Sequence, residues 1–98
     1  MATYSVSKSK HATLTIDTTD TVTITGTASN LRVVNHGGES AAPIYFTYGD
    51  DPTAATVAGN NTVVVLPGTE TVVKYDGSNA KVSLICSAAM PYSVEAKD

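Results

Sequence analysis

Apolar and polar residues alternate with a period of two along most of the chain. In residues 12–16, for example, Ala12, Leu14 and Ile16 share one side and threonines occupy the other. Side chains of a β-strand point alternately to its two faces, so this pattern predicts strands with one buried face. The breaks between the runs are rich in Gly, Pro, Asp and Asn, which favour tight turns.

The same reasoning predicts eight strands, over residues 12–16, 21–25, 31–35, 44–48, 62–66, 70–75, 81–87 and 92–97. We expect the first two strands to form one hairpin, and 62–66 and 70–75 to form another around the Pro67-Gly68 turn. Phe46 is the only phenylalanine and is the expected centre of the core. The predicted fold is all-β, a single antiparallel β-sandwich of about eight strands, with Ig-like and jelly-roll topologies both open.

Composition supports one small all-β domain. Thr, Val and Ile make up 31 of the 98 residues, which is the β-branched bias of strands. A net charge of −3 with 15% charged residues argues against nucleic-acid binding. No apolar run is long enough to span a bilayer or to act as a signal peptide, so we expect synthesis in the cytoplasm and no membrane partner.

Chemically active residues are sparse, and we expect no enzyme activity and no cofactor. A triad of His36, Glu39 and Ser40 would lie in a glycine-flanked loop without an oxyanion framework. The two histidines are far apart in sequence, and Cys86 lies on an apolar strand face, so neither predicts a metal site. The aspartates at residues 17, 20, 50 and 51 are expected to be turn residues, with a structural calcium ion as the alternative.

Two segments point to a partner surface. Residues 62–66 are apolar on both faces, with Val63 and Val65 on one side and Val64 and Leu66 on the other. A strand with one wet face should alternate, so the second face is covered either by residues 54–58 or by another chain.

The N-terminal segment is the second segment that points to a partner surface. Residues 1–11 contain Lys8 and Lys10 and no carboxylate, whereas residues 12–98 are acidic. We predict that 1–11 is an arm or extended segment attached to a sandwich domain over 12–98. Such an arm either frays or orders on an acidic partner, adding a strand through Tyr4 and Val6.

The order of elements resembles small accessory proteins encoded by tailed bacteriophages. The resemblance covers roughly residues 20–96 and is carried by the runs 21–25, 31–35, 43–47, 51–53, 61–68, 82–85 and 92–94. Residues 1–19 do not align with that pattern. Such proteins are capsid decoration or other virion surface components, so the resemblance implies a non-enzymatic structural protein.

On this basis we expect a capsid decoration protein that binds the assembled major capsid protein in multiple copies on the virion surface. The candidate contact residues are Tyr4, Val6, Lys8, Lys10, Val64 and Leu66. The alternative is a carbohydrate- or receptor-binding module on a phage tail or bacterial surface, in which Tyr45, Tyr48 and Tyr75 stack on sugar rings.

Overall fold

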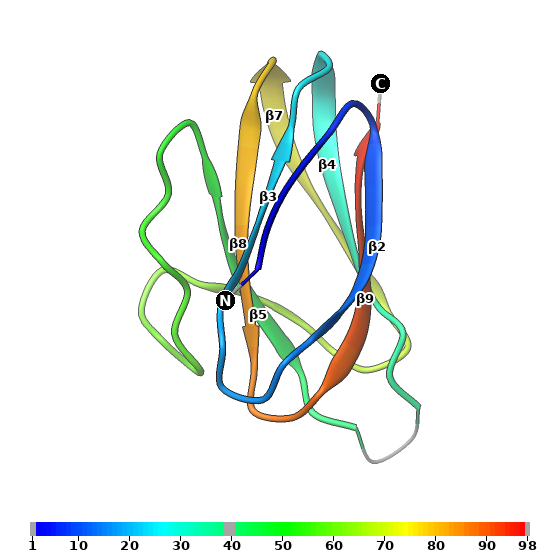
Figure 1. Cartoon of the computed structure of the whole chain (residues 1–98), viewed down its shortest axis with the longest axis vertical. Helices are drawn as coiled ribbons and strands as arrows, with labels where there is room; N and C mark the ends of the chain where they lie inside the picture. Colours follow the sequence, from blue (N-terminus) through cyan, green and yellow to red (C-terminus); the bar gives the residue numbers. More distant parts are fainter. Residues whose placement is uncertain (1, 39–40, 98) are drawn as a thin grey trace.

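The computed structural model describes residues 2–38 and 41–97, which form nine strands in two sheets (Figure 1). One sheet has five strands in the order β1-β3-β8-β5-β6, and the other has four in the order β2-β9-β4-β7. The strands are β1 (Thr3–Val6), β2 (Ser9–Leu14), β3 (Asp20–Ile24), β4 (Ala28–Asn35), β5 (Ile44–Gly49), β6 (Val63–Val65), β7 (Glu70–Gly77), β8 (Ala80–Cys86) and β9 (Met90–Lys97). The predicted all-β sandwich is confirmed. Within the described ranges there is no helix with the length and apolar character needed to cross a membrane.

From β2 onwards the strands pair in a nested order. β2 pairs with β9, β3 with β8, β4 with β7 and β5 with β6, and all four pairs are antiparallel. The chain therefore resembles one long hairpin that has been rolled up, with the β4–β9 and β5–β8 pairs joining the roll into two sheets. This is the jelly-roll topology, one of the two that the sequence leaves open.

Both predicted hairpins are wrong. β2 and β3 belong to different sheets, and so do β6 and β7. In each case the chain crosses between the sheets at the turn, so that the apolar faces of both strands reach a shared core. β2 also ends at Leu14, and Ile16 is 58% exposed instead of lying on the buried face.

The core lies between the two sheets and is built from the alternating residues of both. Phe46 is fully buried at its expected place, and the Cys86 side chain is also fully buried. The other large side chains that are almost wholly buried come from seven strands: Leu14, Val22, Ile24, Leu31, Val33, Ile44, Val65, Val82, Leu84, Tyr92 and Val94.

The N-terminal segment is extended, but it belongs to the sandwich. β1 pairs with β3 in parallel, from Thr3 opposite Thr21 to Val6 opposite Ile24. β2 then runs without a break across the predicted domain boundary between residues 11 and 12. The sandwich therefore begins at β1, because the alternation of Tyr4 and Val6 supplies apolar side chains to the core.

A buried carboxylate joins the two sheets beside β1. Asp20, the first residue of β3, accepts a 3.0 Å hydrogen bond at Oδ2 from the Tyr92 hydroxyl on β9. Its Oδ1 accepts a 3.3 Å bond from the Ala2 amide, next to β1. Burial, the charge of Asp20 and this hydrogen bond raise the pKa of Tyr92 far above its usual range. The contact thus ties β1, the five-stranded sheet and the four-stranded sheet together.

The long connection between β5 and β6 folds over the outer face of the five-stranded sheet. Ala55 is buried there, and its amide donates a 3.0 Å hydrogen bond to Ser83 Oγ on β8. This hydrogen bond holds residues 54–58 over part of β8. The alternation of apolar and polar residues along the strands does not predict such a contact.

Replacing Tyr92 with Phe should lower the free energy of unfolding by about 1–3 kcal/mol, because the buried Asp20 Oδ2 loses its donor. Urea denaturation followed by circular dichroism measures this. Tyr45→Phe is the matched control, since Tyr45 is half-buried on an outer face, and should change stability by less than about 0.5 kcal/mol. Equal losses in the two variants would contradict the assigned role of Asp20.

Alkaline pH should weaken the fold through the same contact. Unfolded tyrosine ionises near pH 10, whereas the pKa of Tyr92 in the folded protein is raised by burial and by Asp20. The contribution of Tyr92 is therefore complete below about pH 10 and is lost as pH rises above it. Unfolding free energies from pH 8 to 11 should fall more steeply for the wild type than for Tyr92→Phe. Parallel curves would refute this linkage.

Candidate functional site

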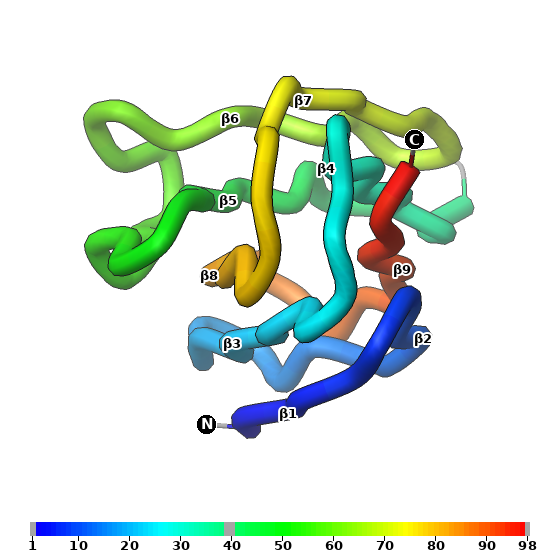
Figure 2. Tube along the Cα trace, turned by 90° about the horizontal axis from the view of Figure 1, so that it is seen from above, coloured from blue at the N-terminus to red at the C-terminus, as the bar shows by residue number. Residues whose placement is uncertain are grey.

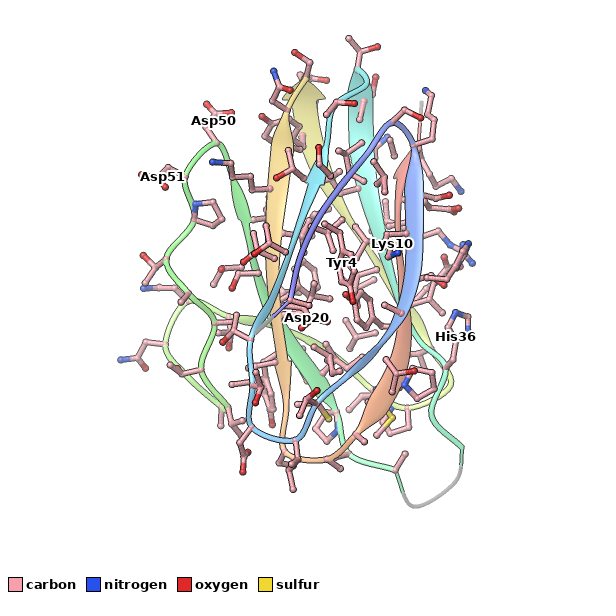
Figure 3. The ribbon with its side chains drawn as sticks, viewed as in Figure 1. Tyr4, Lys10, Asp20, His36, Asp50 and Asp51 are labelled. Carbon is pink, nitrogen blue, oxygen red and sulfur yellow. The ribbon has the colours of Figure 1, made fainter. Side chains whose placement is uncertain are left out.

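The predicted contact residues of the N-terminal segment lie beside β1, where Figure 3 shows Tyr4, Lys10 and Asp20. Tyr4 and Val6 are half-buried and pack against the core of their own sandwich, so their side chains are not presented to a partner as predicted. The Lys10 ammonium lies 4.2 Å from the centroid of the Tyr4 ring, which is cation–π geometry. Lys8 is exposed. Within this group, Lys8 is the side chain best placed to meet another molecule.

The second predicted contact group lies on β6 and just after it. Val64 is 44% exposed and Leu66 is 57% exposed, whereas Val65 between them is fully buried. Tyr45 on β5 lies opposite Val64 in the sheet register and is half-buried. We call Tyr45, Val64 and Leu66 the β6 apolar patch. The segment 54–58, expected as one possible cover for this strand, is instead anchored to β8 through Ala55, and leaves the patch open.

A buried asparagine holds the backbone under the patch. The fully buried Asn35 side chain donates a 3.0 Å hydrogen bond to the Val65 carbonyl. The Gly68 amide donates a 2.9 Å bond to the Asn35 carbonyl, and Gly68 has a φ of 72°, which glycine adopts without strain. The backbone on both sides of Leu66 is therefore fixed, and the patch is presented by a rigid element.

Tyr4 and Val6 on β1 lie at the opposite edge of the five-stranded sheet from Val64 on β6, whereas Lys10 lies on β2 of the other sheet. β1 and β6 are the outer strands of the five-stranded order, and Figure 2 shows them at opposite sides of the molecule. Four strand spacings separate them, which corresponds to about 19 Å. A small partner surface therefore cannot contact β1 and the β6 apolar patch at once.

Sequence reasoning missed a cluster on the outer face of the four-stranded sheet. His11 Nδ1 on β2 lies 2.5 Å from Ser93 Oγ on β9, and His36 Nε2, just after β4, lies 2.6 Å from the same oxygen. Ser93 is buried beneath the two exposed imidazoles. A serine hydroxyl donates only one hydrogen bond, so at most one imidazole accepts from Ser93 and at least one donates to it.

This cluster depends on pairing between distant strands. His11 is opposite Ser93 in the β2–β9 register, and Ser93 is opposite Val34 in the β9–β4 register. His36 follows Val34 by two residues and so shares its face. The available signal was the alternation in residues 9–14 and 90–97, which places His11 and Ser93 on outer faces, but nothing local says that these faces meet.

An ion-pair network flanks the cluster on the same face. Arg32 Nη1 lies 2.7 Å from Glu95 Oε1, and Arg32 Nε pairs with Glu70 Oε2. Hydrogen bonds to Glu70 and Glu95 raise the pKa of Arg32. One cation thus meets two carboxylates, while Lys74 and Lys97 lie one outward position farther along β7 and β9.

A separate groove of about 350 Å³ lies at the β5–β6 connection, and its described lining carries no charged side chain. Tyr48 supplies an aromatic ring, and amides and hydroxyls supply most of the polar groups. Its lining is Thr47, Tyr48, Pro52, Thr53, Ala54, Thr56, Asn60, Asn61 and Thr62. This lining suits a neutral polar ligand.

The predicted sugar-stacking tyrosines do not gather in that groove. Tyr48 lines it, Tyr45 belongs to the β6 apolar patch, and the Tyr75 hydroxyl donates a hydrogen bond to Asp50. The bond to Asp50 raises the pKa of Tyr75. A stacking platform of three rings is therefore excluded.

The alternative of a calcium ion at the turn aspartates finds no cluster to support it. Asp20 is buried in its contact with Tyr92, and Asp17 is exposed in the preceding turn. Within residues 2–38 and 41–97, no group of three or more His, Cys, Asp or Glu side chains is arranged to hold a metal ion. Glu39 and Ser40 of the considered triad lie outside the described residues.

Comparisons with known proteins give no relative from which a function could be transferred. The chain matches no protein-family model, and it finds no match among curated proteins or solved structures.

Proposed function

We propose that this protein is a non-enzymatic virion structural protein, a capsid decoration protein that binds assembled coat subunits and reinforces the shell. The observation that carries the proposal is the β6 apolar patch, which lies on an edge strand and is open to solvent. The jelly roll is used by viral capsid proteins and also by lectins, so the fold alone does not choose between these roles.

The patch suits a weak contact that is repeated many times. Burying a whole valine or leucine side chain contributes about 1.5–3 kcal/mol. Val64 and Leu66 are already partly buried in the free protein, so docking would bury only the remaining surface of each. One such contact is too weak to hold a complex by itself. On a shell, an array of identical contacts gains strength through avidity, and binding to the assembled form stabilises that form by mass action.

The separation between Lys8 and the β6 apolar patch supports reinforcement. The β6 apolar patch would dock on one coat subunit, while Lys8, between β1 and β2, would meet an acidic surface of a neighbouring subunit. One decoration molecule would then bridge two major capsid protein subunits. Bridging would oppose the separation of neighbouring subunits.

Replacing Val64 and Leu66 together with Glu should abolish binding to shells, because the contact would bury two charges without partners. Co-sedimentation with undecorated heads of the encoding phage measures this at micromolar protein. We expect at least a tenfold loss of bound protein. Val72→Glu is the matched control, since Val72 is a 49% exposed valine on the outer face of the other sheet, and it should bind like the wild type.

Failure of the wild-type protein to sediment with the heads, or its absence from purified particles by mass spectrometry, would reject the decoration role. Equal binding by the double variant and the wild type would reject the patch as its contact surface.

A second candidate function is supported by the groove beside Tyr48. An uncharged lining with one aromatic ring and several amides and hydroxyls fits a neutral saccharide, whose C–H face stacks on the ring while its hydroxyls pair with the amides. This would make the protein a carbohydrate- or receptor-binding module on a phage tail or bacterial surface.

In that case a glycan array should give hits that Tyr48→Ala removes. Tyr45→Ala is the control, because Tyr45 lies outside the groove, and it should keep them. An array without hits for the wild-type protein would eliminate the carbohydrate function.

A further inference from the structure

We propose that His11 and His36 form a two-histidine binding site for a divalent late transition-metal ion, with Zn²⁺ as its representative, over Ser93 on the outer face of the four-stranded sheet. This proposal is independent of the capsid and saccharide proposals, because it uses residues of neither the patch nor the groove.

The geometry points to one shared position. His11 Nδ1 and His36 Nε2 are directed at the same atom, Ser93 Oγ, from 2.5 and 2.6 Å. The two nitrogens are therefore no more than about 5 Å apart. A tetrahedral Zn²⁺ ion holds imidazole nitrogens at about 2.0–2.1 Å, which places two of them roughly 3.3 Å apart. Both imidazoles are exposed, so small side-chain rotations can bring the nitrogens to that separation.

The chemistry of the donors favours late transition metals. Neutral imidazole is a good ligand for Zn²⁺, Cu²⁺ and Ni²⁺, whereas Mg²⁺ and Ca²⁺ prefer oxygen ligands. The ion would replace the Ser93 hydroxyl as the partner of both nitrogens; an imidazole that donates to Ser93 would carry its proton on its other ring nitrogen instead, and water would complete the coordination. Ser93, which is buried, would remain beneath the ion as a second-sphere support or an oxygen ligand.

Carboxylates lie on the same face as the two imidazoles. Glu95 is two residues from Ser93 on the same face of β9, and it shares Arg32 with Glu70. The single positive charge of Arg32 is thus balanced by two carboxylates. Lys74 and Lys97 lie one outward position beyond Val72 and Glu95, farther from Ser93.

Calorimetric titration of the full chain with Zn²⁺ tests the proposal. We expect one ion per molecule with micromolar affinity, and no heat with Mg²⁺ at the same concentration. His11→Asn and His36→Asn should each weaken Zn²⁺ binding at least tenfold, because each removes half of a chelate. Thr13→Asn is the matched control, since Thr13 lies one outward position from His11 on β2, and it should bind Zn²⁺ like the wild type.

Amide NMR spectra supply a second measurement. Zn²⁺ should shift the signals of His11, His36 and Ser93 together, and the dispersed spectra of the variants should show that they are folded. Two independent surface histidines would behave differently, with each single variant keeping a weak site of unchanged affinity. That result, or no response of the wild type to millimolar Zn²⁺, would overturn the proposal.

Discussion

The structure depends on the burial of two apolar sheet faces that neither sheet can bury alone. Within the described residues, each step along the chain except β5 to β6 passes to the other sheet, so both faces are assembled from alternating pieces of sequence. A two-sheet core is stable only when both halves are present. Asp20 and Tyr92 add a polar tie across this core, and the same tie recruits the backbone of the N-terminal segment. The strands that carry the β6 apolar patch and the histidine cluster are held in place by this core.

Much of the local structure could be predicted from alternation, and the pairing could not. All eight predicted strands overlap observed ones, although 12–16 is displaced from β2, because a period of two is a local property of a half-buried strand. The predicted hairpins β2–β3 and β6–β7 are wrong because alternation indicates which face of a strand is buried but not which sheet the strand belongs to. β1 was missed as part of the sandwich, since its parallel pairing with β3 leaves no turn signal between neighbours.

The candidate sites also differ in how far the sequence alone could predict them. The exposed side of β6 could be predicted because Val64 and Leu66 break the rule that a wet face is polar. The histidine cluster could not, because His11 and Ser93 are brought together only by the β2–β9 register, which joins distant parts of the chain. The inward orientation of Tyr4 and Val6 likewise required β3 as a neighbour. Surface chemistry on a jelly roll therefore depends on long-range register more than on motif spacing.

The central place of β9 in the four-stranded sheet has a kinetic consequence. This strand lies between β2 and β4, so the sheet cannot close until β9 has been synthesised. Loop closure over long sequence separations makes such topologies slow to fold, and incomplete chains leave unpaired strand edges exposed. Until β9 emerges, the edges of β2 and β4 that it joins have no partner and are open to pairing with other chains.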